Sequence, residues 1–285
     1  MFPFNLTGPQ FLAFYAAFSA VALVAYWYYT SPRQAPARST RSQELAADPY
    51  KIACLRGGEE EAIRLSIVNL VDRGLLANDG LMLKATGVAR SDALRIPLER
   101  AIVTHCASPT LPGALLGDRA VRAACVEYDK DLQRKGLLFK DEERRARLNA
   151  LRVVVLLLGG IAFARILQAL SHGRANIVFL IILTGIACWI AYGIYSRRIT
   201  PAGNQALTNL ATLLQRLKNQ VSRLTPGGVT NEAVLLAAVF GIYALPAPAF
   251  PFVEQIFPRP RGQSDASGSA SFDSGGGGCG GGGGG

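Results

Sequence analysis

The sequence has little of what catalytic and metal sites are built from. Its 285 residues include only two histidines, His105 and His172, and five cysteines that form no C-x-x-C pair. This argues against zinc, whose structural sites need several closely spaced Cys or His ligands. The chain also has no Walker loop, no dinucleotide fingerprint between a strand and a helix, and no H-E-x-x-H helix. We therefore expect no enzyme activity, no cofactor and no metal.

Charged residues are also scarce, at 18% of the chain, and they are unevenly placed. Residues 33–150 hold 20 Lys or Arg and 16 Asp or Glu, so only four of the ten excess positive charges lie there. Three long apolar stretches elsewhere hold almost none. This alternation is typical of a membrane protein with one water-exposed domain.

The three apolar stretches predict membrane-spanning helices. Residues 11–29 are uncharged, and a helix of that length covers a hydrocarbon core of about 30 Å. Residues 26–29 are Tyr-Trp-Tyr-Tyr, which is typical of an aromatic belt. A very short turn joins residues 153–170 to residues 177–195, which predicts a helical hairpin. Arg165 lies near the outer end of its stretch, so its guanidinium can reach the interface.

Arginines at the ends of the stretches predict the orientation. Arg33, Arg38 and Arg41 follow the first stretch, and Arg197 and Arg198 follow the third. Positive charge favours the cytoplasmic side. The N-terminus is then outside, with residues 33–150 and the C-terminal tail in the cytoplasm. The predicted divisions are an external N-terminus at 1–10, an anchor at 11–30, a linker at 31–43, a domain at 44–150, a transmembrane hairpin at 151–196, an amphipathic and an apolar interfacial helix at 197–258, and a disordered tail at 259–285.

The residue pattern of the domain at 44–150 predicts helices and one short β-hairpin. Glu59, Glu60 and Glu61 favour a helix start, because acidic side chains stabilise the first helical turn, and Gly74 ends that helix. Apolar residues then flank the turn residues of 78–80, which predicts a β-hairpin. A helix followed by a hairpin is the layout of a winged helix. Residues 134–138 echo residues 72–76, which indicates either a divergent internal repeat or two helix ends of the same type.

The charges of this domain favour a protein partner over nucleic acid. Residues 59–72 carry three Glu, one Asp and a single Arg, and such a surface repels phosphate. A second candidate helix around residues 119–129 is close to neutral. The plainer interpretation of both is a charged surface in contact with water.

Two segments after the third stretch have alternative interpretations. A narrow apolar seam is formed by Leu207, Leu210, Leu214, Leu217, Val221 and Leu224. It packs either on the domain or against a second copy of the chain, giving a homo-oligomer. Residues 233–245 are apolar but too short to span comfortably, so they lie at the membrane surface or pack on the domain.

The glycine-rich segment 259–285 has almost no core-forming residue and predicts a disordered, low-complexity tail. It contains Cys279. A thiol in an accessible tail is chemically open to acylation, disulfide capture or enzymatic modification. Cys279 is therefore the one candidate modification site.

These features together resemble a known family. They are residues 8–12 with Tyr15, residues 48–58, residues 73–76, the paired spans, Thr200-Pro201 with Gly203, and the glycine tail with Cys279. The arrangement is similar to that of an uncharacterised family of bacterial membrane proteins with glycine- and cysteine-rich C-termini. Members carry several tail cysteines, whereas this tail has one. The resemblance implies the bacterial inner membrane and supplies no catalytic residue.

We expect a mainly α-helical, multi-pass protein of the inner (plasma) membrane with a winged-helix-like cytoplasmic domain. Its expected function is that of a membrane-anchored interaction or scaffold module for an unknown protein partner. Two alternatives are a membrane-tethered transcription regulator and an accessory subunit of a transporter or enzyme complex.

Overall fold

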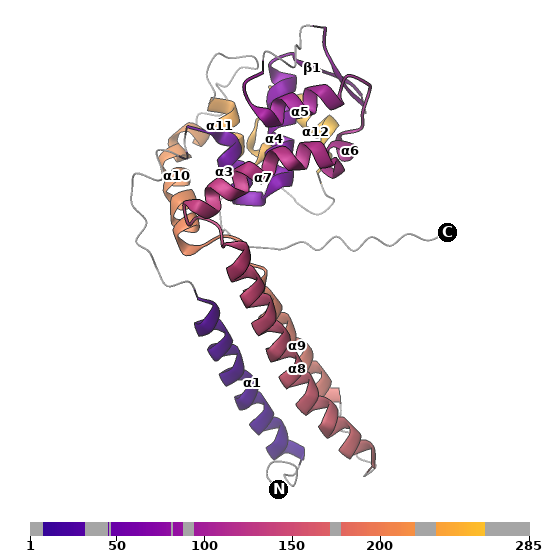
Figure 1. The fold of residues 1–285 in the computed structure, drawn as a ribbon, viewed down its shortest axis with the longest axis vertical. Helices are drawn as coiled ribbons and strands as arrows, with labels where there is room; N and C mark the ends of the chain where they lie inside the picture. Colours follow the sequence, from indigo (N-terminus) through magenta and orange to yellow (C-terminus); the bar gives the residue numbers. More distant parts are fainter. Residues whose placement is uncertain are drawn as a thin grey trace, which may run out of the picture. The chain divides into compact units, whose positions relative to one another are not determined.

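The computed structural model describes residues 8–31, 45, 47–80, 82–87, 94–171, 178–219 and 232–259. These residues are mainly helical, with one two-stranded sheet (Figure 1). The chain divides into two compact units. Unit 1 comprises residues 1–33, 139–198 and 273–285, and unit 2 comprises residues 34–138 and 199–272.

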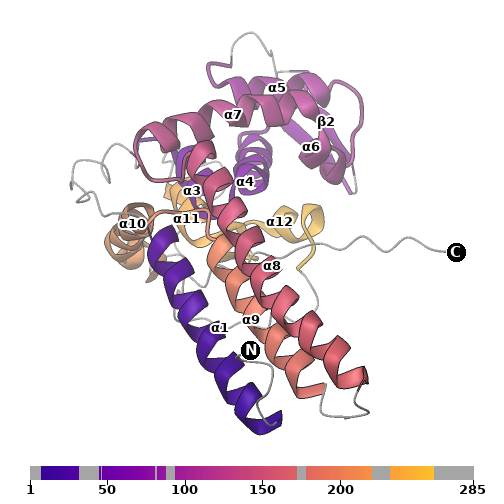
Figure 2. The same ribbon diagram turned by 60° about the horizontal axis from the view of Figure 1, so that its bottom comes forward.

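Unit 1 contains three helices that lie side by side (Figures 1 and 2). They are α1 (Gly8–Thr30), α8 (Asp141–Ser171) and α9 (Val178–Tyr195). Each has a segment long and apolar enough to cross a membrane: Gln10–Thr30, Asp141–Leu167 and Val178–Tyr195. Large apolar side chains, including Trp27, Leu156 and Trp189, are exposed on these helices. The prediction of three apolar helices is confirmed.

A tyrosine hydroxyl links the three helices of unit 1. Tyr15 of α1 is fully buried, and its hydroxyl donates to the Leu158 carbonyl of α8 at 3.1 Å. The same hydroxyl shares a hydrogen bond with Thr184 Oγ1 of α9 at 2.9 Å. In hydrocarbon such groups need partners within the protein, so this contact favours one rotation of α1 against the hairpin. The Arg165 guanidinium lies over the Phe11 ring, 4.5 Å from its centroid.

Unit 2 is built around helix α4 (Glu59–Asp72). The side chains of Ile63, Ile67 and Leu70 recur at helical spacing and are fully buried. Helices α3, α5, α6, α7 and α11 contact α4. The helical bounds are α3 Pro49–Gly57, α5 Pro97–His105, α6 Pro112–Gly117, α7 Arg119–Arg134, α10 Pro201–Asn219, α11 Glu232–Phe240, the 3₁₀ helix η3 Ile242–Ala244 and α12 Pro251–Ile256.

A short antiparallel hairpin follows α4. Strand β1 (Leu76–Asp79) pairs with β2 (Met82–Ala85), with Leu76 opposite Ala85 and Asp79 opposite Met82. Gly80 in the turn has φ +74°, which glycine adopts without strain. Leu76 and Leu83 are buried in the core, so the hairpin closes one side of α4.

The repeated sequence phrase corresponds to two helix ends of one type. Gly74 after α4 and Gly136 after α7 both have φ +69°. The amide of Leu75 donates to the Leu70 carbonyl at 2.9 Å, and that of Leu137 donates to the Leu132 carbonyl at 3.0 Å. Both ends therefore form the Schellman motif, in which a left-handed glycine lets the chain reverse onto the helix. This shared geometry accounts for the similarity of residues 72–76 and 134–138 without a repeated domain.

Segments that precede α8 and segments that follow α9 share one hydrophobic core. Leu207 and Leu210 of α10 and Leu236 and Ala237 of α11 are buried in the same cluster as residues of α3 and α4. Residues 141–150 instead begin the long helix α8 of unit 1. Of the two placements expected for residues 233–245, burial of α11 corresponds to packing on the domain and not to the membrane surface. A short helix that is apolar all round removes more surface from water inside a core than at an interface.

Candidate functional site around helix α4

A buried carboxylate joins three helices of unit 2. Glu99 of α5 is only 2% exposed. Its Oε1 accepts hydrogen bonds from the Tyr50 hydroxyl at 2.6 Å and from Asn69 Nδ2 at 3.3 Å. Its Oε2 accepts from Arg73 Nη1 at 3.0 Å. Asn69 Nδ2 also donates to the Tyr50 hydroxyl oxygen at 2.5 Å. We call Tyr50, Asn69, Arg73 and Glu99 the Glu99 cluster.

The electrostatics of the Glu99 cluster favour a positioning role. Burial and the Glu99 carboxylate raise the pKa of the Tyr50 hydroxyl, so it stays protonated and donates. Arg73 balances the buried charge from a partly exposed position. A buried charge is tolerated when it is paired and hydrogen-bonded, as it is here. The cluster therefore fixes α5 against α3 and the C-terminal half of α4.

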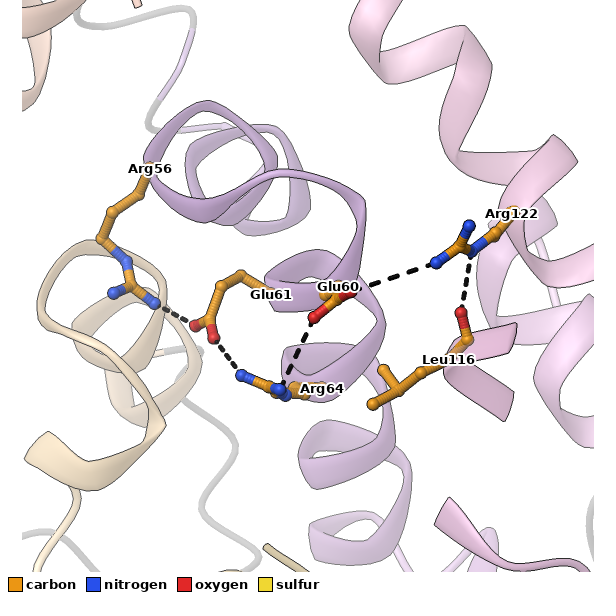
Figure 3. A network of polar contacts seen from close by, with 6 residues as sticks. All are labelled: Arg56, Glu60, Glu61, Arg64, Leu116 and Arg122. Carbon is orange, nitrogen blue, oxygen red and sulfur yellow. Dashed lines mark hydrogen bonds and ion pairs between the residues drawn. The ribbon is translucent and has the colours of Figure 1, made fainter. Parts of the chain in front are cut away.

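A second network surrounds the first turn of α4 (Figure 3). Glu61 pairs with Arg56 of α3 and with Arg64, whose Nη1 lies 2.8 Å from Glu61 Oε1. Glu60 lies 3.6 Å from Arg64 and 4.0 Å from Arg122 of α7. The two glutamates thus lie among three guanidinium groups, and we call these five residues the α4 charge network.

Backbone carbonyls extend the α4 charge network to other elements. Arg56 Nε donates to the Ala238 carbonyl of α11 at 3.1 Å. Figure 3 shows the second contact, in which Arg122 Nε donates to the Leu116 carbonyl of α6 at 2.8 Å. Arg64 also lies over the Phe257 ring, 5.9 Å from its centroid. The arginines of this surface are therefore engaged by acids, carbonyls and a ring within the same unit.

Two apolar side chains are exposed beside the hairpin. Leu83 of β2 exchanges backbone hydrogen bonds of 2.9 Å with Thr110, in an antiparallel bridge. That register places Met82 opposite Leu111. Met82 is 46% exposed and Leu111 52% exposed. We call Met82 and Leu111 the hairpin patch.

The thiols of unit 2 are placed where they are poor nucleophiles. Burial raises the pKa of Cys106 to about 11. Burial, then the carboxylates of Glu59 and Asp129, raise the pKa of Cys125 to about 12. Cys54 Sγ donates to Asp129 Oδ1 at 3.1 Å. Because the thiolate is the reactive form, these thiols act as apolar packing groups near neutral pH.

His105 lies next to the N-terminal cap of α7. Its Nδ1 is 3.4 Å from Asp118 Oδ2. Asp118 Oδ1 accepts from the amides of Ala120 and Val121, both at 2.9 Å. The Val121 amide and then His105 lower the pKa of the Asp118 carboxyl. Because Asp118 is engaged by helix amides, this pair serves to start α7.

Other residues singled out from the sequence are only partly described. Cys279, His172, Val221 and Leu224 lie outside the described residues. The described part of the apolar seam, Leu207, Leu210 and Leu214, packs on the core of unit 2. Among the residues that the structure describes, no group of three His, Cys, Asp or Glu side chains has the geometry to hold a metal ion.

Sequence reasoning missed the Glu99 cluster, although a signal for it exists. Glu99 lies between Leu98 and the pair Ile102–Val103, and all three apolar residues are buried. An acidic residue inside an apolar helical stripe indicates a buried carboxylate that needs donors. The identity of the donors depends on tertiary contacts.

Comparisons with known proteins return no match. No protein-family model matches the chain, and neither the search of curated proteins nor the search of solved structures finds a match.

Proposed function

We propose that this chain is a membrane-anchored interaction module. Helices α1, α8 and α9 hold it in the inner membrane, and unit 2 docks another protein in the cytoplasm. The observation that carries the proposal is the hairpin patch. Met82 of β2 and Leu111, which precedes α6, are both exposed next to the Leu83–Thr110 bridge, and the opposite face of the β-hairpin is held by the buried Leu76 and Leu83. Rigidly held apolar side chains of this kind suit a protein contact, and methionine adapts to its partner.

The α4 charge network supports a protein partner over nucleic acid. In a winged-helix-like arrangement, α4 would be the helix presented to the groove and β1–β2 the wing. Arg56, Arg64 and Arg122 are engaged by Glu60, Glu61 and backbone carbonyls, so phosphate would have to displace these contacts.

The two alternative functions predict different observations. A membrane-tethered regulator would bind DNA with a strong salt dependence, and an accessory subunit would copurify with a transporter or enzyme.

Contacts between the helix ends of unit 1 support the proposal that all segments of unit 2 lie on the same, cytoplasmic side of the membrane. The Tyr26 hydroxyl near the end of α1 donates to the Arg147 carbonyl near the start of α8, at 3.4 Å. Arg147 in turn donates to the Ile194 carbonyl near the end of α9, at 2.8 Å. The chain therefore leaves the three helices for unit 2 at one end of the bundle. Three spans would make the chain multi-pass, and the positive-inside rule would then place its N-terminus outside.

Site-specific photocrosslinking in native membranes tests the proposal. A photoreactive residue at position 82 or 111 of the full chain should give a discrete, nuclease-resistant protein adduct. The matched control is position 213, where Leu213 is exposed on α10 away from the hairpin patch. Adducts at 213 equal to those at 82 and 111, or adducts removed by nuclease, contradict the proposal.

The tail around Cys279 is proposed as a tether or modification site, and mass spectrometry of the native C-terminal peptide checks it.

A further inference from the structure

Six arginines gather at one end of the helical hairpin of unit 1. They are Arg144, Arg145, Arg147, Arg152, Arg197 and Arg198, and we call them the hairpin arginines. Residues 144–152 form one stretch of α8, and residues 197 and 198 follow the end of α9. Neither stretch contains an acidic residue. All of these arginines except Arg147 are exposed.

Arg147 brings the two stretches together. Its Nη1 donates to the Arg197 carbonyl at 3.1 Å, and its Nη2 donates to the Ile194 carbonyl at 2.8 Å. Its guanidinium lies over the Phe139 ring, 4.2 Å from the centroid. Cations favour the negative end of a helix, and Arg147 satisfies the Ile194 carbonyl in the last turn of α9 and the Arg197 carbonyl just after it. The backbone after α9 is thereby held against the start of α8, next to the other arginines.

The apolar surface begins directly beyond these arginines. Val153, which is exposed, follows Arg152 on α8, and the exposed Tyr192 precedes Arg197 on α9. Trp27, Tyr28 and Tyr29 of α1 are also exposed close to Tyr26, whose hydroxyl contacts the Arg147 carbonyl. Aromatic side chains next to an apolar band mark the level of lipid headgroups.

The acidic residues of this region lie farther from the apolar band. Asp141, Glu142 and Glu143 form the first turn of α8. At about 1.5 Å per residue, Asp141 lies about 16 Å along the helix axis from Arg152, whereas Glu143 directly precedes Arg144. The arginines therefore lie between the acids and the apolar surface, where a phosphate group of the bilayer would meet them first.

We infer that the hairpin arginines bind the phosphate of anionic phospholipid headgroups. Guanidinium groups pair with phosphate oxygens through two parallel hydrogen bonds, and basic clusters beside membrane helices attract anionic lipid. Zwitterionic lipid gives a weaker attraction because its own cation opposes the arginines. This binding goes beyond the proposed docking of a protein and depends only on unit 1 lying in a bilayer.

Native mass spectrometry of the full chain tests the inference. Detergent micelles are titrated with phosphatidylglycerol or phosphatidylcholine, and the bound lipid is counted. The test variant is Arg144→Gln/Arg145→Gln/Arg152→Gln. The control is Arg119→Gln/Lys130→Gln/Arg134→Gln, which removes three exposed cations from α7 in unit 2.

The unaltered chain should bind phosphatidylglycerol more tightly than phosphatidylcholine. The test variant should lose affinity for phosphatidylglycerol by on the order of 100-fold, at the usual contribution of each basic residue near an anionic surface. The control should bind as the unaltered chain does. The variant Arg144→Lys/Arg145→Lys/Arg152→Lys should retain most of the preference for phosphatidylglycerol, which separates loss of charge from loss of fold.

Three outcomes would overturn the inference. One is equal binding of the two lipids by the unaltered chain, a result that needs no variant to fold. Another is an equal loss of affinity in test and control variants. The third is competition by an oligonucleotide that matches phosphatidylglycerol, because it would assign the cluster to nucleic acid. Glycerol 1-phosphate should compete only weakly, because it lacks the acyl chains that hold a headgroup at the apolar band.

Discussion

Replacing Glu99 by glutamine removes one charge from the interior of unit 2 while keeping the shape of the side chain. The retained oxygen still accepts from Tyr50 and Asn69. The new amide nitrogen faces Arg73, so the 3.0 Å charged hydrogen bond is lost. Such a bond contributes about 1.5–3 kcal/mol, and the partly exposed Arg73 recovers some of it from water. We expect the free energy of unfolding to fall by about 2 kcal/mol.

Buried thiols provide the assay for this change. Cys54, Cys106 and Cys125 lie in the core of unit 2 and react with a maleimide only when the unit opens. The full chain is labelled in detergent with Cys188→Ala and Cys279→Ala as background. A loss of about 2 kcal/mol increases the labelling rate about 30-fold.

Glu127→Gln is the matched control for Glu99→Gln, because Glu127 is an exposed glutamate on α7. It should change the labelling rate less than about threefold, as surface substitutions do. A Glu99→Gln chain labelled as slowly as this control would refute the reasoning, because the buried carboxylate would then contribute nothing to stability.

Three further substitutions test other parts of the structure. Gly203→Ala should lower the thermal midpoint in detergent strongly, because an added Cβ would clash with the backbone carbonyl oxygen of Leu137, whereas Gly117→Ala, with nothing within 4 Å, should change it little. Asp131→Asn should destabilise by less than about 1 kcal/mol at neutral pH, because Lys51 at 2.7 Å lowers the pKa of the Asp131 carboxyl. This stabilisation is complete above the pKa of an unfolded aspartate, about 3.9, and is lost as pH falls through the lower folded value, so urea midpoints of the two proteins should converge in acid. Tyr15→Phe should destabilise the helices of unit 1 by about 0.6–1.7 kcal/mol in detergent unfolding, and an unchanged midpoint would contradict its linking role.

Elements that depend on local patterns could be predicted from the sequence. The apolar helices follow from length and composition, and the start of α4 follows from Glu59 to Glu61. The hairpin follows from the turn residues around Gly80, whose positive φ the structure confirms. In each case the residues that determine the structure are neighbours in the chain.

Elements that depend on distant contacts could not be predicted. The apolar run of α11 suits a membrane interface and a protein core equally well, because it has no polar face to orient it. Its contacts with α3, α4 and α10 place it in unit 2. Arg147 likewise looks like any basic residue flanking a span, and its role depends on carbonyls some 50 residues later.

The core of unit 2 combines helices that precede α8 and α9 in the chain with helices that follow them. Helices α3 to α7 leave the ribosome before α8 and α9, and α10 to α12 leave it afterwards. Until the later helices are synthesised, the surface that α11 covers on α3 and α4 stays open to water. On the membrane placement proposed above, completion of the unit 2 core is therefore coupled to insertion of α8 and α9 into the bilayer. A nascent chain stalled before residue 232 would present apolar surface to chaperones and proteases. Incomplete chains would therefore be recognised and degraded before unit 2 is complete.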